Sequence, residues 1–232
     1  MARNAQLDLG LRNLPRWGGR RAGAGRKPAM VRRDPHRRRA IFGRTTPCHV
    51  TLKVRTGLPS LRSARFVRAF EASMHRGCDR GFFRVAHWSV QRNHLHLVVE
   101  ASSTRDLGNG MKSIALRVVR AAQRAFGLGR RGAVLRDRSN VRMLHSPREV
   151  RRALAYVLLN ARRHAAQRGI ALDRVAARVD PASSGRWFDG WKGRPVVETS
   201  GGPAVARPRS WLLAVGWRRA GLIDLAEIPG PR

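Results

Sequence analysis

Two histidines set two residues apart are the side chains of this sequence that best suit metal chemistry. His94 and His96 fall in the stretch HLHLVVE at 94–100, whose alternation is typical of a strand. Residues two apart in a strand point to one face and lie about 7 Å apart along it, so both imidazoles can share one divalent ion. A His-x-His pair alone is more often structural than metal-binding, so a metal site needs a third ligand.

A helix further along the chain offers that ligand. Tyr156 and Asn160 are four residues apart in a segment with helical periodicity, so they lie one above the other beside the apolar arc of the helix. The amide oxygen of Asn160 is a hard ligand suited to Mg²⁺ or Mn²⁺. Tyr156 is the only tyrosine in the chain and a candidate nucleophile. Its alternative role is a tyrosine at the edge of the core with its hydroxyl in water.

The charge balance indicates a polyanionic partner. The chain of 232 residues holds 48 Lys and Arg against 14 Asp and Glu, a formal net charge of +34. A compact fold with this self-repulsion favours a nucleic acid nearby, and Arg matches phosphate geometry better than Lys does. A GC-rich genome would explain the choice of Arg over Lys, but it would not explain the shortage of acids. No apolar run approaches ~18 residues, so neither export nor a membrane span is expected.

The elements that must position these residues follow one another in a recognisable order. We expect a strand at 49–54, a helix from about 60 to 77, strands at 82–91 and 94–100, a helix at 104–126, a strand at about 133–144, and a helix from 147 to about 167. The first six predict an α+β fold, a ferredoxin-like antiparallel sheet (β-α-β-β-α-β) with its helices on one face. The last helix is additional and begins with a capping box at Ser146 and Glu149.

Composition divides the chain into three parts. Residues 1–44 form a basic, Gly-rich arm that we expect to be disordered without DNA; residues 45–170 form the folded domain; and residues 171–232 form a Trp-, Pro- and Gly-rich appendage. Within the arm, Arg26 and Lys27 belong to a Gly-Arg-Lys-Pro stretch that resembles the core of minor-groove AT-hook peptides. The alternative for the arm is a solvated tail with no defined role.

The strand and helix motifs together resemble the HUH endonucleases, and most closely the REP-associated tyrosine transposases, from about residue 49 to residue 168. The resemblance rests on Asn93-His94-Leu-His96 and on Tyr156-Val-Leu-Leu-Asn160. It implies that His94, His96 and Asn160 hold one Mg²⁺ or Mn²⁺ that polarises a scissile phosphate. It also implies that Tyr156 attacks single-stranded DNA of hairpin or repeat sequences, leaving a 5′-phosphotyrosine and a free 3′-hydroxyl.

Basic residues on two helices are candidates for further phosphate contacts. They are Lys112, Arg117 and Arg120 on the helix at 104–126, and Arg152 and Arg163 on the last helix, besides Arg26 and Lys27 in the arm. Solvated helix faces are the alternative for about half of such residues. Glu100 shares the histidine face and could support the ligands, although a solvated glutamate at a strand end is favoured. For His164, a surface position is favoured over one near the metal.

Three functions are open at this point. The favoured one is a transposase-like enzyme that nicks and rejoins single-stranded DNA. An HUH replication initiator or relaxase is the nearest enzyme alternative, but such proteins often have a second tyrosine or a third histidine. A nucleic-acid-binding protein of the same fold without catalysis is the third. The resemblance further implies a bacterial, cytoplasmic, nucleoid-associated protein, without a membrane or protein partner, and a monomer is favoured over a homodimer.

Overall fold

The computed structural model describes residue 42 and residues 44–129, 133–170, 178–195, 197 and 201–230. Nearly all of the basic arm, with the predicted contacts Arg26 and Lys27, lies outside the described residues. Within the described residues, no helix is long and apolar enough to span a lipid bilayer.

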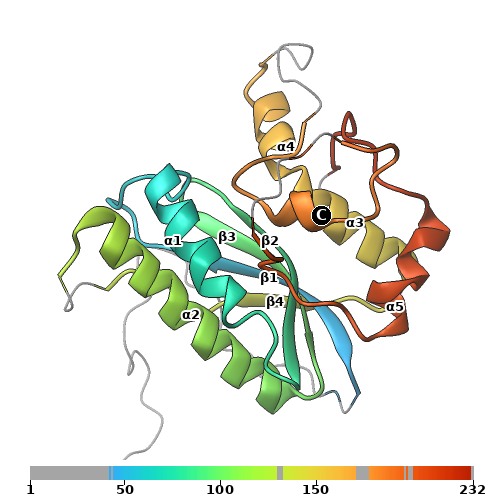
Figure 1. The fold of residues 1–232 in the computed structure, drawn as a ribbon, viewed down its shortest axis with the longest axis horizontal. Helices are drawn as coiled ribbons and strands as arrows, with labels where there is room; N and C mark the ends of the chain where they lie inside the picture. Colours follow the sequence, from blue (N-terminus) through green and yellow to red (C-terminus); the bar gives the residue numbers. More distant parts are fainter. Residues whose placement is uncertain are drawn as a thin grey trace, which may run out of the picture. The chain divides into compact units, whose positions relative to one another are not determined.

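A four-stranded antiparallel sheet forms the centre of the fold (Figure 1). Its strands are β1 (Thr46–Lys53), β2 (Phe83–Val90), β3 (His94–Ala101) and β4 (Asn140–Met143). They lie in the order β2-β3-β1-β4, so that β1 pairs with both β3 and β4. This order is that of a ferredoxin-like sheet, and it confirms the predicted fold class.

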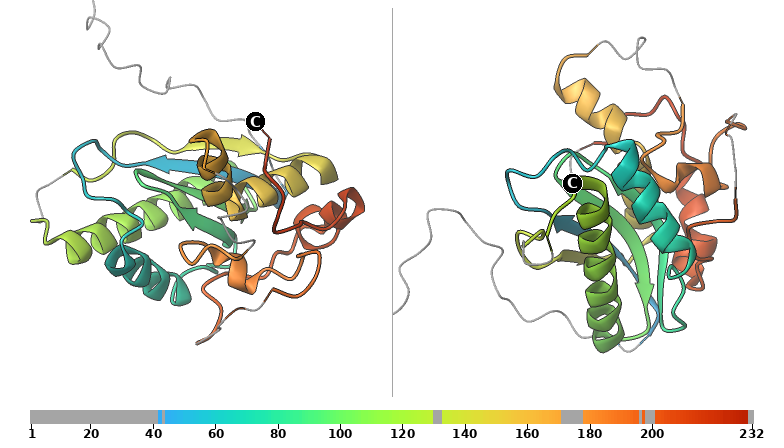
Figure 2. Two further views of the ribbon diagram at one scale, coloured as in Figure 1. Left: turned by 90° about the horizontal axis from the view of Figure 1, so that it is seen from above. Right: turned by 60° about the vertical axis from the view of Figure 1, so that its left-hand side comes forward.

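Two helices, α1 (Ala64–His75) and α2 (Thr104–Phe126), cover one face of the sheet (Figures 1 and 2). The apolar side chains that alternate with the histidines of β3 point into this layer: Leu95, Leu97 and Val99 are fully buried. The end of α2 agrees with the prediction, because Gly127 takes the left-handed conformation (φ 64°) that ends many helices. α1 begins later than predicted, because Ser63 rather than Ser60 caps its first turn.

The additional helix packs on the opposite face of the sheet, but it is two helices rather than one. α3 (Pro147–Leu158) begins at the predicted capping box, and α4 (Asn160–Gln167) follows after a break at Leu159. Leu158 and Leu159 are both buried in the same apolar cluster. Neighbouring residues of a regular helix point in directions about 100° apart, so the break accompanies the burial of both side chains. Backbone bonds from Leu159 to Ala155 and from Arg163 to Leu159 keep the four-residue spacing across the break.

The predicted strand at 133–144 is also shorter than expected. Only Asn140–Met143 pair with β1, and a single bridge joins Leu135 to Val54. Between these points the side chain of Asp137 accepts a hydrogen bond from the backbone N–H of Arg138 at 2.9 Å. Local bonds of this kind compete with strand pairing.

The appendage packs against β2 and α3. Its apolar side chains form one buried cluster with those of α3, namely Phe188, Trp191, Leu213, Trp217 and Ile223. Its short helical turns are η2 (Ser184–Trp187), α5 (Trp211–Ala214) and η3 (Gly216–Ala220). Backbone bonds from Val90 to Ala182 and from Ala206 to Val85 cover the outer edge of β2. An uncovered edge would be open to pairing with other chains, so the appendage protects the sheet.

One extra residue in β2 changes which side chains face the helices. Phe83 and Val85 belong to the core beneath α1 and α2, and so do Trp88 and Val90, although strict alternation would place these pairs on opposite faces. The register shifts between Val85 and His87, which is a β-bulge. The bulge therefore keeps both apolar pairs in the same core.

Glu100 at the end of β3 holds the appendage to the sheet. Its side chain is fully buried and accepts hydrogen bonds from the backbone N–H groups of Arg209, at 2.7 Å, and Ser210, at 2.9 Å. The hydroxyl of Ser210 donates to it as well. The favoured expectation of a solvated Glu100 is wrong, because sequence alone does not reveal a partner more than 100 residues away. Glu100 also lies at the opposite end of β3 from His94, so it does not support the histidines.

Replacing Glu100 with alanine should destabilise the protein, because it leaves the backbone N–H groups of Arg209 and Ser210 without the acceptors they have in the fold. We expect a loss of about 1–3 kcal/mol in the free energy of unfolding, measured by urea denaturation. Glu100→Gln keeps one carbonyl acceptor and should lose less. A Glu100→Ala protein as stable as the unmodified one would show that these bonds contribute nothing.

Candidate active site

The face of the sheet opposite α1 and α2 carries a row of polar side chains. His94 and His96 project from β3, and His49 and Thr51 project from β1. In β1 these two residues alternate with Val50 and the other core positions. Thr51 pairs directly with His96, and paired residues of antiparallel strands face the same side.

The two predicted ligand histidines converge. Their Nε2 atoms lie 2.9 Å apart and their ring centroids 4.6 Å apart. The Nδ1 atom of His94 lies 2.8 Å from Oδ1 of Asn93. Burial, with a smaller contribution from neighbouring basic groups, lowers the pKa of His94 to about 4 and that of His96 to about 3. Both rings are therefore neutral at pH 7, the form in which imidazole binds a metal.

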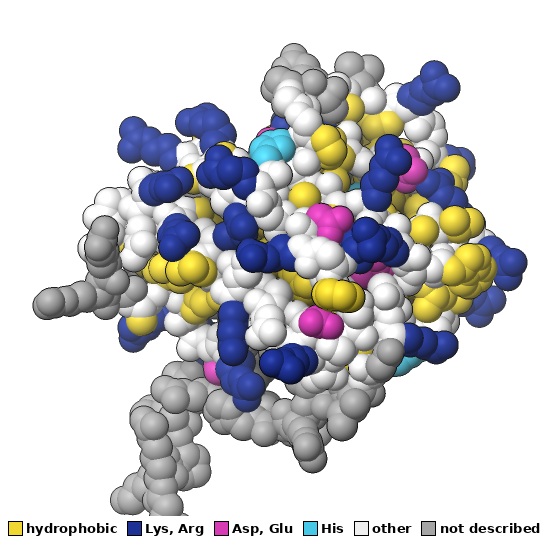
Figure 3. All heavy atoms as spheres, turned by 60° about the horizontal axis from the view of Figure 1, so that its bottom comes forward, with side chains coloured by type: hydrophobic (Ala, Val, Ile, Leu, Met, Phe, Trp, Pro, Cys, Tyr) yellow, Lys and Arg dark blue, Asp and Glu magenta, His cyan; other side chains and the backbone are white. Residues whose placement is uncertain are grey.

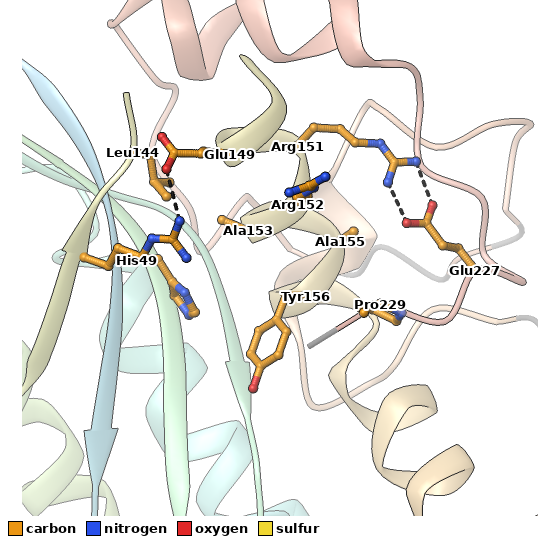
Figure 4. Close-up of a pocket in the computed structure, with 12 residues that line it drawn as sticks. His49, Leu144, Glu149, Arg151, Arg152, Ala153, Ala155, Tyr156, Glu227 and Pro229 are labelled. Carbon is orange, nitrogen blue, oxygen red and sulfur yellow. Dashed lines mark hydrogen bonds and ion pairs between the residues drawn. The ribbon is translucent and has the colours of Figure 1, made fainter. Parts of the chain in front are cut away.

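The predicted nucleophile lies against these histidines. Tyr156 extends from α3 towards the sheet (Figure 4), and its ring centroid is 5.0 Å from that of His96 and 5.6 Å from that of His49. The guanidinium carbon of Arg163 is 5.2 Å from the centre of the tyrosine ring. A cation at this distance is attracted to the ring face.

Asn160 is buried more deeply than its place beside the apolar arc suggested. It is fully buried, and neither its amide oxygen nor its amide nitrogen has a hydrogen-bond partner among the described residues. It stands one turn from Tyr156, which packs on His96, and one turn from His164, whose ring centroid is 6.2 Å from that of His94. Asn160 thus lies on the helical side that faces the histidine pair. His164 borders the pair as well, contrary to the favoured expectation of a mere surface residue.

His49 is the site residue that the sequence analysis missed. Its side chain is almost fully buried, and its Nε2 atom is 3.3 Å from Nδ1 of His96, while Oγ1 of Thr51 is 3.2 Å from the same nitrogen. If Nδ1 of His96 carries the proton, Nε2 is left as a ligand atom, and these two neighbours hold the ring in place. The alternation of residues 49–54 contained this signal, but using it required knowing that β1 lies beside β3.

A cavity of about 480 Å³ opens beside Tyr156 (Figure 4). His49 lines it from the sheet, Arg152 from the exposed side of α3, and Glu227 from the appendage. Glu227 forms a bidentate ion pair with Arg151, with N–O distances of 2.5 and 2.6 Å. The cavity is therefore bounded by the sheet, α3 and the appendage together.

The predicted DNA contacts divide between the two faces of the sheet. Arg152 and Arg163 lie beside Tyr156, and Arg163 also donates to the carbonyl oxygen of Pro229 at 2.9 Å. Lys112, Arg117 and Arg120 lie on α2, across the sheet from the histidines, and Arg117 donates to the carbonyl oxygen of Ser73 near the end of α1. Lys and Arg side chains predominate over acidic ones on the face drawn in Figure 3.

The donor set suits one divalent ion. Within the described residues, no three His, Cys, Asp or Glu side chains group as a metal site. Two ligands at right angles on an octahedral Mg²⁺ with bonds near 2.1 Å are about 3.0 Å apart. The 2.9 Å between the Nε2 atoms of His94 and His96 fits this value. The unpaired, buried amide of Asn160 has a free oxygen to complete the set.

Fold and site together define an α+β protein whose sheet presents a His-x-His strand to a tyrosine-bearing helix. No family model matches the chain. No curated protein matches it either. Among solved structures, a REP-associated tyrosine transposase bound to a REP hairpin is distantly similar, with 17% identity and a TM-score of 0.46 over 76% of this chain and all of that one.

Replacing Asn160 with leucine, which branches at the same carbon, should stabilise the metal-free protein. The substitution removes two buried polar atoms that have no partners, and leaving such groups unpaired costs about 1–3 kcal/mol. We expect the free energy of unfolding to rise by an amount in this range when urea denaturation is carried out with a chelator. A fall in stability would mean that the amide makes a favourable contact in the metal-free fold.

Proposed function

We propose that this protein is a metal-dependent enzyme that cuts and rejoins single-stranded DNA, with Tyr156 as its nucleophile. The observation that carries the proposal is the packing of the Tyr156 ring on His96, one of two neutral histidines whose Nε2 atoms converge. A tyrosine needed only for the core would not require a neighbouring pair of ligand-type histidines and a buried amide without partners.

The cofactor proposed is Mg²⁺ or Mn²⁺, held by His94, His96 and Asn160. Such an ion would act as a Lewis acid on an oxygen of the scissile phosphate. The chain itself supplies neutral rings at neutral pH and a fixed orientation for His96, through His49 and Thr51. Arg152 and Arg163 place positive charge where the phosphodiester would lie.

The proposed reaction is a reversible transesterification. The phenolic oxygen of Tyr156 forms a bond to phosphorus while the bond from phosphorus to the 3′-oxygen breaks. The phenolic proton passes to water, and the departing 3′-oxygen takes up a proton to become a hydroxyl. Attack by a 3′-hydroxyl on the phosphotyrosine reverses the step and joins a strand, so no nucleotide cofactor is required.

The proposed substrate is a single strand with hairpin or repeat sequences, and the protein is proposed to act as a monomer. The excess of 34 positive charges supports a nucleic-acid partner, while the choice of hairpins rests on the motif resemblance. Binding of this kind should weaken steeply with salt, because each neutralised phosphate releases counterions.

A covalent adduct tests the nucleophile. The protein incubated with Mn²⁺ and end-labelled single-stranded hairpins should give a labelled band that survives denaturing electrophoresis, and Tyr156→Phe should remove that band entirely, because phenylalanine has no attacking oxygen. Phenylalanine otherwise fills the same space, so equal circular dichroism spectra and equal hairpin affinity serve as controls. Tight, salt-sensitive binding without any adduct would instead favour a binding protein without catalysis.

Metal affinity tests the role of His49. His49→Leu should weaken Mn²⁺ binding by roughly tenfold or more, measured by isothermal titration calorimetry, because residues that orient a ligand typically contribute that much. His49→Gln offers an amide oxygen to Nδ1 of His96 and should recover part of the affinity. Unchanged Mn²⁺ affinity in His49→Leu would show that His49 does not orient the ligand.

A further inference from the structure

The outer face of α1 and α2 carries a small cavity lined by arginines. The two helices lie side by side across the sheet from α3 (Figures 1 and 2), and a cavity of about 180 Å³ lies between them. Four guanidinium groups surround it, and the described residues that line it include no carboxylate. Its lining residues are Ala69, Ser73, Arg76, Arg117, Arg120, Ala121 and Arg124.

One arginine of this cavity is held in a fixed position. The guanidinium of Arg117 donates to the carbonyl oxygen of Ser73 and lies against Gly77, where an added Cβ would be 1.8 Å from Nη2. Its Nε atom is buried and has no hydrogen-bond partner among the described residues. Burial, followed by the charges of Arg80 and Arg76, lowers the pKa of Arg117, yet an arginine stays protonated at pH 7. The fold thus holds a partly desolvated cation among other cations, an arrangement that a bound anion would relieve.

The size and chemistry of the cavity favour a phosphate group. The acidic residues of this segment, Glu71 and Asp79, pair with Arg186 and Arg84, each at 3.3 Å, and neither lines the cavity. A volume of about 180 Å³ is below the range of sites for whole small ligands, so it suits one small anionic group rather than a complete nucleotide. Arginine donors match the oxygens of a phosphate in pairs.

An exposed aromatic ring borders the same face. Phe82 is 69% exposed, so most of its surface meets solvent, and it lines a neighbouring cavity of about 240 Å³ with Arg80 and Ser113. Nη1 of Arg80 donates to Oγ of Ser113 at 3.2 Å. Ser113 precedes Arg117 by one turn of α2, a rise of about 6 Å, so the two cavities follow one another along the helix. Asp106 also lines the cavity beside Phe82, and its carboxylate accepts a hydrogen bond from the hydroxyl of Ser103.

Arginines beside an open aromatic ring form the combination by which proteins bind single strands. The arginines follow the phosphates, and the ring stacks on a base. In a duplex the bases stack on one another and are not free to cover such a ring. The ring therefore favours a single strand over a duplex or a free anion.

We propose that the outer face of α1 and α2 binds a segment of single-stranded DNA other than the segment at Tyr156. One phosphate lies in the arginine cavity, and a nearby base stacks on Phe82. The sheet separates this face from Tyr156, so a strand that reaches both must pass around an edge of the sheet. This second site rests on the proposed binding of single-stranded DNA, but it does not depend on cleavage.

Photocrosslinking tests where the strand lies. We would use the full chain carrying Tyr156→Phe, with a chelator present, and ten-nucleotide dT strands in which one thymine is replaced by 5-iododeoxyuridine. Irradiation should join the modified base to Phe82, and mass spectrometry of the digested adduct would identify the peptide. Phe82→Leu keeps apolar bulk but removes the ring, so the yield of this crosslink should fall at least fivefold.

Salt dependence tests the arginine cavity. The double variant Arg120→Gln, Arg124→Gln removes two exposed guanidinium groups and no core side chain. The slope of log affinity for the dT strand against log salt should become shallower by about 0.7, the value for one phosphate of a single strand. The matched control is Arg105→Gln, an exposed arginine of the same helix that lines neither cavity, and its slope should equal that of the parent.

The outcomes separate this site from the nicking site. An unchanged slope in the double variant, or crosslinks that never include Phe82, would overturn the proposal. So would inorganic phosphate binding to the parent but not to the double variant while both bind the strand alike, because the cavity would then serve a free anion. Both measurements are made without metal and without the tyrosine hydroxyl. A protein that never forms the covalent adduct can therefore pass both, and one that forms it can fail both.

Discussion

The packing of α3 across the polar face of the sheet is the interaction on which the rest of the molecule depends. Val98 of β3 pairs with His49 of β1, on the face that carries the histidines, and is fully buried with Leu154 and Val157 of α3. This apolar contact holds the tyrosine over His96 and closes the amide of Asn160 away from water. Burying an amide without partners opposes folding, so the surrounding apolar contacts must offset it. A group that opposes folding in this way, as the amide of Asn160 does, is typical of a functional site.

Much of the fold could be predicted because its signals are local. Alternation located the strands, and caps such as Gly127 and Ser146 located helix ends to within a residue. The histidine pair and its facing helix could be predicted for the same reason. His49 and Glu100 could not, since the role of each depends on contacts with residues far away in the sequence. The break at Leu159 was also missed, because helical periodicity is nearly the same on both sides of it.

The appendage contributes side chains to two cavities of the protein. Glu227 borders the cavity beside Tyr156, and Trp217 borders a second one, beside His87 of β2. A single segment therefore contributes a wall to both cavities, and Glu100 fastens that segment to the strand that carries the histidines.

The bulge in β2 places a constraint of length on the chain. Because Ala86 is the extra residue, Trp88 faces the core while His87 and Ser89 face the other side. Inserting one further residue here would send every later side chain of the strand to the wrong face, whereas deleting Ala86 would remove the bulge and leave these side chains in regular alternation. The strand should therefore tolerate the loss of its bulge residue better than the addition of a residue. Wherever the same architecture has been inherited, insertions in this strand should be rarer than loss of the bulge residue.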